Sequence, residues 1–221
     1  MIHTLYNPRK GESTYAVGHL AVGYLCGKVT TKVLNAKLNL PLIFLVSIIS
    51  DIDLLIPSLI HRGPTHSITL SLLIFLPVFV IHGKEALPYF VGLIQHPLIG
   101  DYLTGDTQLL WPLTTKWYGA GVGMTSQTNI LLEWGLFLTF LTLMIKTKDA
   151  HNLLQPHPTN LILTIPILTV LLPALFSFPL YVPSELIIPH LTYLTLFTLS
   201  ILKDLKTKKD TEKPQIVDPQ I

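Results

Sequence analysis

Residues 67–83 read SITLSLLIFLPVFVIHG, a stretch without Asp, Glu, Lys or Arg. The charge-free interval around it extends from Arg62 to Lys84, and two more lie between Asp149 and Glu185 and between Glu185 and Lys203. A helix of about 20 apolar residues crosses a bilayer, and runs of this length are too continuous for membrane strands. The stretch therefore predicts a helix that spans a membrane.

The composition of the whole chain is also strongly apolar and poor in charge. Of its 221 residues, 49% are hydrophobic and 13% are charged, and the mean hydropathy is +0.53, whereas a soluble domain carries about 25% charged residues. Intrinsic disorder is excluded because it requires low hydrophobicity and high charge, and the single cysteine, Cys26, excludes a disulfide scaffold. A net charge of +2 is too small to indicate a nucleic-acid partner. The remaining class is a polytopic membrane protein.

The chain is therefore expected to fold as an all-α, polytopic transmembrane bundle of about seven spans within residues 15–202. Residues 1–14 form an N-terminal tail, and residues 203–221, which are charged and contain proline, form a disordered tail. The expected helices are Tyr15–Leu34, Asn39–Ile60, His66–His82, Ala86–Leu103, Asn129–Lys146, Asn160–Val182 and Ser184–Leu202.

The distribution of lysine and arginine predicts the orientation, because cytoplasmic loops carry an excess of both. One set of loops and ends holds 11 of the 15 basic residues, and the other holds only Arg9, Lys10, Arg62 and Lys116. This places the protein in the cell membrane with an extracytoplasmic N-terminus and a cytoplasmic C-terminus.

Ionisable residues inside a membrane are costly and mark functional sites. Seven of them fall at one depth, in the outer half of the predicted helices or at their outer ends: His19, Asp51, Asp53, His61, His66, His96 and Asp101. Nitrogen and carboxylate ligands without thiolate suit Zn²⁺, Mn²⁺ or Fe, and sets of this size often hold two ions. We therefore expect a divalent metal, Zn or Mn, in one or two ions on the extracytoplasmic side.

Other interpretations of single residues exist. Asp51 could form a buried ion pair with Arg62, and Gly63-Pro64 could be only a tight turn. Residues two apart in a regular helix diverge by about 200°, so Asp51 and Asp53 share a site only if the helix is irregular, or they serve two ions. None of these alternatives explains seven candidates at one depth.

The pattern also resembles a family. Gly18-His19-Leu20, Asp51-Ile52-Asp53, the segment HRGPTHS at 61–67, His96 with Asp101, and Leu110-Trp111-Pro112 follow the order of the membrane-bound metal-dependent hydrolases, a group that includes the LexA-regulated inner-membrane hydrolase. The resemblance covers about residues 15–135. It implies a hydrolase, and Glu133 resembles an acidic residue of the family. The family's later His and Asp are four apart, whereas His96 and Asp101 are five apart, so their joint ligation requires a helix bulge.

Neighbouring groups fit a phosphoester in a lipid or lipid-linked substrate. Asp53, Arg62 and Glu133 are the candidate catalytic residues, and Arg62 could also clamp an anionic oxygen. Thr65, Ser67 and Thr104 could donate hydrogen bonds to substrate or orient metal ligands. The site lies at headgroup depth with lipid as its wall, so membrane lipid is the expected partner.

The rival interpretation is a divalent-cation or proton-coupled transporter that uses the same His and Asp residues. It would need a second access path from the inner side, where the helices offer few polar groups.

The loop Gly105–Thr128 is expected to lie over the site. Its aromatic residues Trp111, Trp117 and Tyr118 either gate lateral substrate entry or only anchor a static loop at the interface.

Overall fold

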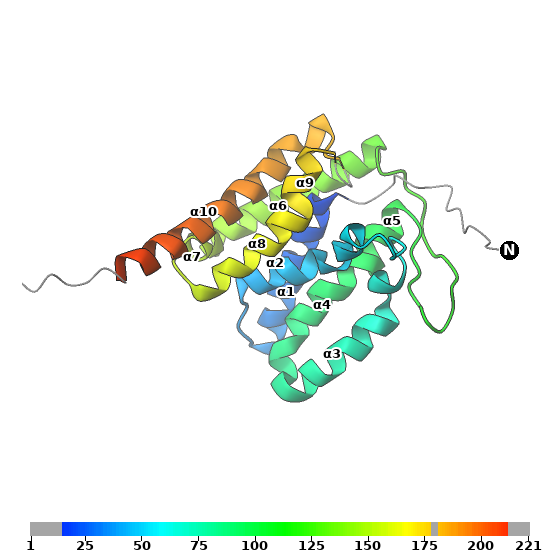
Figure 1. The fold of residues 1–221 in the computed structure, drawn as a ribbon, viewed down its shortest axis with the longest axis horizontal. Helices are drawn as coiled ribbons and strands as arrows, with labels where there is room; N and C mark the ends of the chain where they lie inside the picture. Colours follow the sequence, from blue (N-terminus) through cyan, green and yellow to red (C-terminus); the bar gives the residue numbers. More distant parts are fainter. Residues whose placement is uncertain (1–14, 178–180, 212–221) are drawn as a thin grey trace, which may run out of the picture.

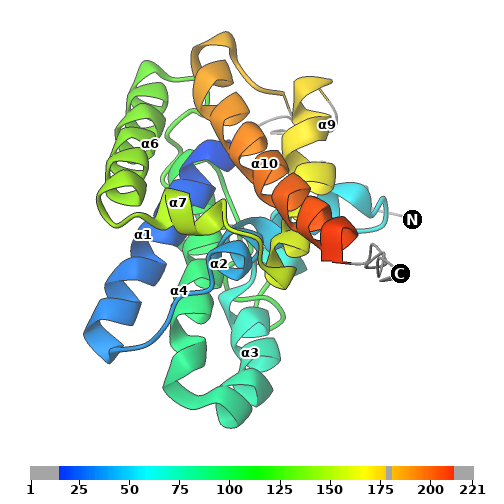
Figure 2. The same ribbon diagram turned by 90° about the vertical axis from the view of Figure 1, so that its left-hand side faces the viewer.

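The computed structural model describes residues 15–177 and 181–211, and these form an α-helical bundle without a β-strand (Figures 1 and 2). The predicted all-α fold is therefore confirmed. The first half of the chain contains α1 (Ala16–Leu34), α2 (Leu40–Ile48) with the 3-10 helix η1 (Ile49–Leu55), the short 3-10 helix η2 (Pro64–His66), α3 (Ile68–His82), the 3-10 turn η3 (Gly83–Ala86), and α4 (Leu87–Gln95) with the π-helix η4 (His96–Asp101) and α5 (Tyr102–Thr104).

The second half follows a long loop. It contains α6 (Gln127–Lys146), α7 (Asp149–Leu153), the continuous segment η5 (Pro158–Leu163), α8 (Thr164–Pro166), η6 (Ile167–Leu171) and α9 (Leu172–Leu175), and finally η7 (Ser184–Leu186) with α10 (Ile187–Thr211). Each predicted helix has a helical counterpart here. Four segments of the described chain are long and apolar enough to cross a membrane, namely Ile68–Thr104, which is the α3–α4 hairpin, Gln127–Lys146, Pro158–Leu175 and Ser184–Lys209.

Three predicted boundaries are wrong. The helix expected over Asn160–Val182 ends at Leu175. The second helix was expected to reach Ile60, but its α-helical part ends at Ile48 and its 3-10 part at Leu55, because Pro57 has no N–H to continue the ladder. The last helix runs to Thr211, so the expected disorder is wrong for residues 203–211. An ion pair between Lys208 Nζ and Asp204 Oδ2 (3.3 Å) supports that extra length. Residues 1–14 and 212–221 lie outside the described part.

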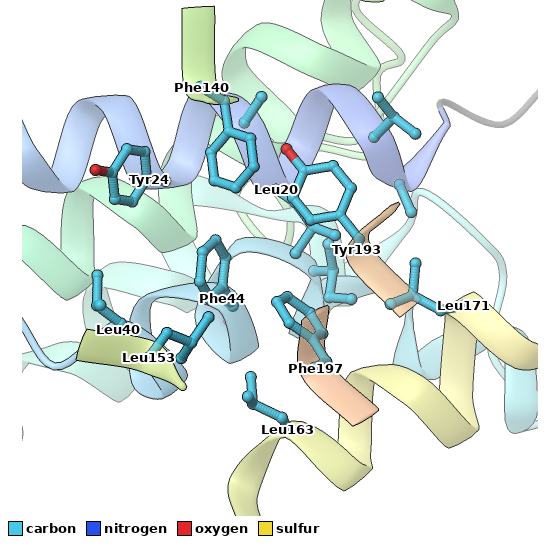
Figure 3. Close-up of a cluster of buried hydrophobic side chains, with 14 of the residues drawn as sticks. Leu20, Tyr24, Leu40, Phe44, Phe140, Leu153, Leu163, Leu171, Tyr193 and Phe197 are labelled. Carbon is cyan, nitrogen blue, oxygen red and sulfur yellow. The ribbon is translucent and has the colours of Figure 1, made fainter. Parts of the chain in front are cut away.

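The apolar core lies between α1, α2, α6 and α10 (Figure 3). Tyr24, Phe44, Phe140, Tyr193 and Phe197 meet in it with ring centroids 4.7–6.1 Å apart along the chain of contacts. All five are buried. This packing fixes α1 and α2 against each other. α1 carries His19, and η1, which follows α2 directly, carries Asp51 and Asp53.

Lysine-bearing loops gather at one end of the bundle. Lys84 Nζ donates to the carbonyl of Leu34 (3.3 Å), and Lys28 Nζ pairs with Asp149 Oδ2 (2.7 Å). The turn after α2 and the long loop after α5 lie toward the other end (Figure 1). The fold thus separates the lysine-rich loops from the turn that carries the His and Asp candidates.

Candidate metal centre

Four donor atoms from three segments, η1, η2 and η4, form a closed ring. His66 Nε2 lies 3.4 Å from Asp51 Oδ1 and 3.2 Å from Asp101 Oδ2, and His96 Nε2 lies 3.2 Å and 3.4 Å from the same two oxygens. A tetrahedral site with metal–ligand bonds of about 2.0–2.2 Å has ligands about 3.3–3.6 Å apart. All four residues are buried. These four separations match the edges of a tetrahedral site for one ion.

The ring nitrogens that face away from this centre are held by hydrogen bonds. His96 Nδ1 donates to the carbonyl of Ser47 (2.7 Å), and His66 Nδ1 lies 3.2 Å from Asp53 Oδ2. Thr65 Oγ1 donates to that same oxygen (2.6 Å). A proton on each Nδ1 leaves the Nε2 lone pair free toward the centre, as in carboxylate–histidine–zinc arrangements.

The helix bulge that joint ligation required is present. His96 and Asp101 are the two ends of the π-helix η4, whose i→i+5 pattern brings residues five apart onto one side. In a regular α-helix they would diverge by about 140°. The bulge brings His96 Nε2 to 3.4 Å from Asp101 Oδ2.

The helix at the two aspartates is also irregular, as expected, but Asp51 and Asp53 point to different partners. Asp51 faces the Nε2 atoms of His66 and His96, whereas Asp53 Oδ1 lies 3.0 Å from His61 Nδ1. His66 stands between the two carboxylates. Asp51, Asp53, His61 and His66 therefore form one group with metal-binding potential, and His19, His96 and Asp101 form a second.

His19 completes the second group from α1. Its ring stacks on His96 with centroids 3.6 Å apart, and its Nε2 lies 3.8 Å from Asp101 Oδ1. Neither ring nitrogen of His19 has a hydrogen-bond partner among the described residues. A buried polar ring without a partner is costly, which fits a place beside an ion.

The electrostatics of the centre favour positive charge. Burial lowers the pKa of His66, but the carboxylates of Asp101, Asp51 and Asp53 outweigh burial and raise that pKa to about 10. His66 lies in η2, in the turn that precedes α3. The residues present thus fit a divalent cation both in geometry and in charge.

Arg62 does not pair with Asp51 and instead joins the turn to η4. Its Nε lies 3.2 Å from Asp101 Oδ1, and its Nη2 donates to Thr104 Oγ1 (3.2 Å). The residue has a φ of +61°, a conformation that costs energy for a non-glycine residue and recurs at functional sites. Gly105 lets the guanidinium approach, because a Cβ there would overlap Nη1.

The other predicted residues take different places. Ser67 caps α3 by accepting from the N–H of Leu70 (3.2 Å), and it donates to the carbonyls of Leu109 and Trp111. Thr65 orients Asp53 and His66, the second of its two expected roles. Glu133 belongs to neither donor group, and its carboxylate packs against Gly18, beside His19.

The long loop covers the turn with its backbone. The N–H of Gln108 and the hydroxyl of Thr107 donate to the carbonyl of Arg62 (2.9 and 3.2 Å), and Thr107 pairs with Tyr118. The expected position of the loop over the site is confirmed for its first part. His61 keeps a quarter of its side chain exposed, whereas the other donors are buried.

Several contributing groups were missed from the sequence. Gln95 Nε2 donates to the carbonyls of His19 and Ser47 (3.2 and 3.3 Å) and joins three helices. Gln95 could have been identified from the sequence, because it is an amide side chain in an otherwise apolar span. The role of the Ser47 carbonyl could not be predicted from the sequence, because every residue carries a backbone carbonyl.

Comparison with known proteins identifies one match. The model of a family described as YdjM inner membrane protein matches residues 15–179, which is more than half of the chain and includes every donor residue above. No curated protein and no solved structure matches the chain significantly.

Proposed function

The chain belongs to the YdjM inner membrane protein family, and on that premise we propose that it is a metal-dependent hydrolase that cleaves a phosphoester in a lipid or lipid-linked substrate. The observation that carries the proposal is the ring of four donor atoms from Asp51, His66, His96 and Asp101. Two nitrogens and two carboxylate oxygens suit Zn²⁺ or Mn²⁺. When bound, such an ion supplies a Lewis acid and activates water.

We assign separate tasks to the residues around the ring. Asp53 and the Ser47 carbonyl fix the two imidazoles, and His61, hydrogen-bonded to Asp53 and partly exposed, exchanges a proton at the mouth. Arg62 is the anion clamp, because a phosphoester oxygen that reaches Asp101 meets the guanidinium beside it. Glu133 stays a candidate that no contact with the donors supports.

The membrane setting favours a substrate with an apolar chain. The protein is an integral membrane protein, and the site lies at the end of the bundle away from the lysine-rich loops. With those loops in the cytoplasm, the site faces the extracytoplasmic side and the C-terminus is cytoplasmic. The substrate then enters at headgroup depth.

Transport of a divalent cation is the competing function for the same cluster. Along α1, the residues between His19 and Lys28 include Leu20 and Tyr24, both fully buried in the apolar core (Figure 3). A cation that left the centre along α1 would have to cross this packed cluster, and the walls between α2, α3 and α4 on the way to the lysine-rich end are mostly apolar. The packing therefore favours hydrolysis at a fixed site.

The test combines metal analysis with a phosphoester panel. Purified protein should contain Zn or Mn and release phosphate or alcohol from at least one lipid phosphoester. Arg62→Lys should keep the metal content and reduce kcat/KM by at least tenfold, because lysine lacks the fork that contacts both Asp101 and Thr104. Lys116→Met, at an exposed loop position, serves as the control. Metal-loaded protein that hydrolyses nothing but moves the ion into liposomes would replace the proposal with transport.

A further inference from the structure

A cavity of about 590 Å³ lies between α2, α3 and α4, within the range of about 300–1,000 Å³ that is typical of ligand pockets. Its walls are mostly apolar, and the residues along them include Leu42, Val46, Phe75, Val78, Tyr89 and Leu93. Helix α3 forms its outer wall and lies at the edge of the bundle beside α4 (Figures 1 and 2).

The apolar end of the cavity lies about one helical turn along α4 from His96. On α4, Leu93 is three residues before His96, a spacing that places both on one face. On α2, Val46 directly precedes Ser47, whose carbonyl accepts from His96. On α3, Phe75 is four residues after the buried Ser71, which is itself four residues after Ser67. The lining thus ends three residues before His96 on α4 and five residues before Asp51 on α2.

The other end is polar. Lys37, His82 and Glu85 line it at the end of the bundle that carries the lysine-bearing loops, and the N–H of Lys37 donates to Glu85 Oε2 (3.3 Å). From Ala86 to Leu93 the helix rises about 10 Å. The cavity therefore has apolar walls at hydrocarbon depth and polar residues at the interface.

Water is disfavoured in the apolar part of this cavity, because the side chains there offer no hydrogen-bond partners. The α3 helix that closes it is exposed along its outer face, with Val80 75% and Ile81 74% exposed, and it is attached to α4 through Phe75 and Phe90, whose rings are 4.6 Å apart. In a bilayer, hydrocarbon is the ligand available to such walls.

We propose that this cavity binds the apolar chain of the lipid substrate while its polar head lies at the metal centre. The proposal rests on the proposed function, since it supplies the binding site for the lipid portion. A chain held there fixes the depth of the head relative to His96 and Asp51. Long-chain substrates are therefore preferred over short-chain ones.

Filling the cavity tests the proposal. Val78 lines it, whereas Val80 on the same helix faces outward, so Val78→Trp and Val80→Trp are a matched pair. For two phosphoesters with the same head and either 16-carbon or 4-carbon chains, Val78→Trp should lower kcat/KM at least tenfold for the long chain and less than twofold for the short one. Val80→Trp should change neither, and both variants should keep their metal. Equal losses on both substrates, or none, would overturn the chain site.

A binding measurement separates this proposal from the hydrolase proposal. Phosphatidic acid with a diazirine at the end of a 16-carbon chain should cross-link to Leu42, Val46 or Leu93 in the wild type and in Val80→Trp, but not in Val78→Trp. If phosphatidylcholine with the same diazirine labels these residues equally, the cavity holds bulk lipid and the proposal is wrong. If the selective labelling occurs without hydrolysis of any phosphoester, the chain site stands and the hydrolase proposal fails.

Discussion

Gly100 packs directly against the imidazole of His19, so closely that a methyl group on its α-carbon would lie 2.6 Å from Nδ1 and overlap Cε1. The contact joins α1 to the π-helix η4 at the centre of the donor cluster. Only a residue without a Cβ lets η4 approach α1 in this way. The glycine is thus part of the metal centre although it offers no ligand.

Gly100→Ala should therefore lower the metal content. The added methyl group has to displace His19 or shift Asp101, and overpacking of this kind costs about 1–3 kcal/mol. Gly135→Ala is the matched control, since a Cβ at Gly135 meets no atom within 4 Å. Metal analysis of the purified variants checks this, and an unchanged metal content in Gly100→Ala would contradict the close contact.

The two aspartates of η1 should respond differently to loss of charge. Asp51→Asn removes a donor from the ring and should abolish stoichiometric metal binding. Asp53→Asn only weakens the orientation of His66, and loss of such a partner typically costs about 10–100-fold in affinity, so metal should still bind at high concentration.

Stoichiometry decides between one ion and two in the same experiment. The ring geometry predicts about one equivalent of metal in the wild type and in metal-saturated Asp53→Asn. Two equivalents in the wild type and one in Asp53→Asn would show instead that Asp53 and His61 hold a second ion.

Much of this site could be predicted from the sequence because a membrane makes charged residues conspicuous. His19, Asp51, His66, His96 and Asp101 stood out against apolar spans, and their shared depth indicated that they meet. The five-residue spacing of His96 and Asp101 even identified where the helix had to depart from α-helical geometry.

The rest depends on distances that no residue type encodes. That Gly100 allows contact with His19, and that Ser47 offers its carbonyl to His96, follows only from how α1, α2 and α4 pack. The end of the second helix was misplaced because its apolar pattern continues beyond Leu55 while its hydrogen bonds do not. Tertiary contacts set the first two features, whereas the helix end is local, because Pro57 has no N–H to continue the ladder.

The orientation in the membrane gives a prediction on intact cells. In a Cys26→Ser background, Lys116→Cys should react with a membrane-impermeant thiol reagent from outside, and Lys148→Cys should not. Both positions are exposed in the structure, and Lys148 borders the end where Lys28 and Asp149 pair. Permeabilised cells serve as the control for Lys148→Cys. The reverse labelling pattern would place the site on the cytoplasmic side.

The long loop should act as a fixed cover whose packing holds Arg62 in place. A Cβ at Gly119 would overlap the carbonyl oxygen of Gly105 and lie 2.6 Å from Asp106 Oδ1, whereas at Gly123 the nearest atom is 4.0 Å away. Gly119→Ala should therefore push the loop off the segment that contacts Arg62 and reduce turnover of long- and short-chain substrates alike, with the metal retained. Gly123→Ala should leave turnover unchanged.

The aromatic residues of that loop decide between a cover and a gate. The N–H groups of Ala120 and Val122 donate to the carbonyls of Tyr102 and Leu103 (2.6 and 2.9 Å), so the backbone is tied to α5 close to Trp117. With the backbone fixed, replacing Trp117 and Tyr118 by alanine removes interfacial anchoring and should affect both substrates equally. A loss confined to the long-chain substrate, with the short-chain reaction spared, would instead identify the loop as a gate for lipid entry.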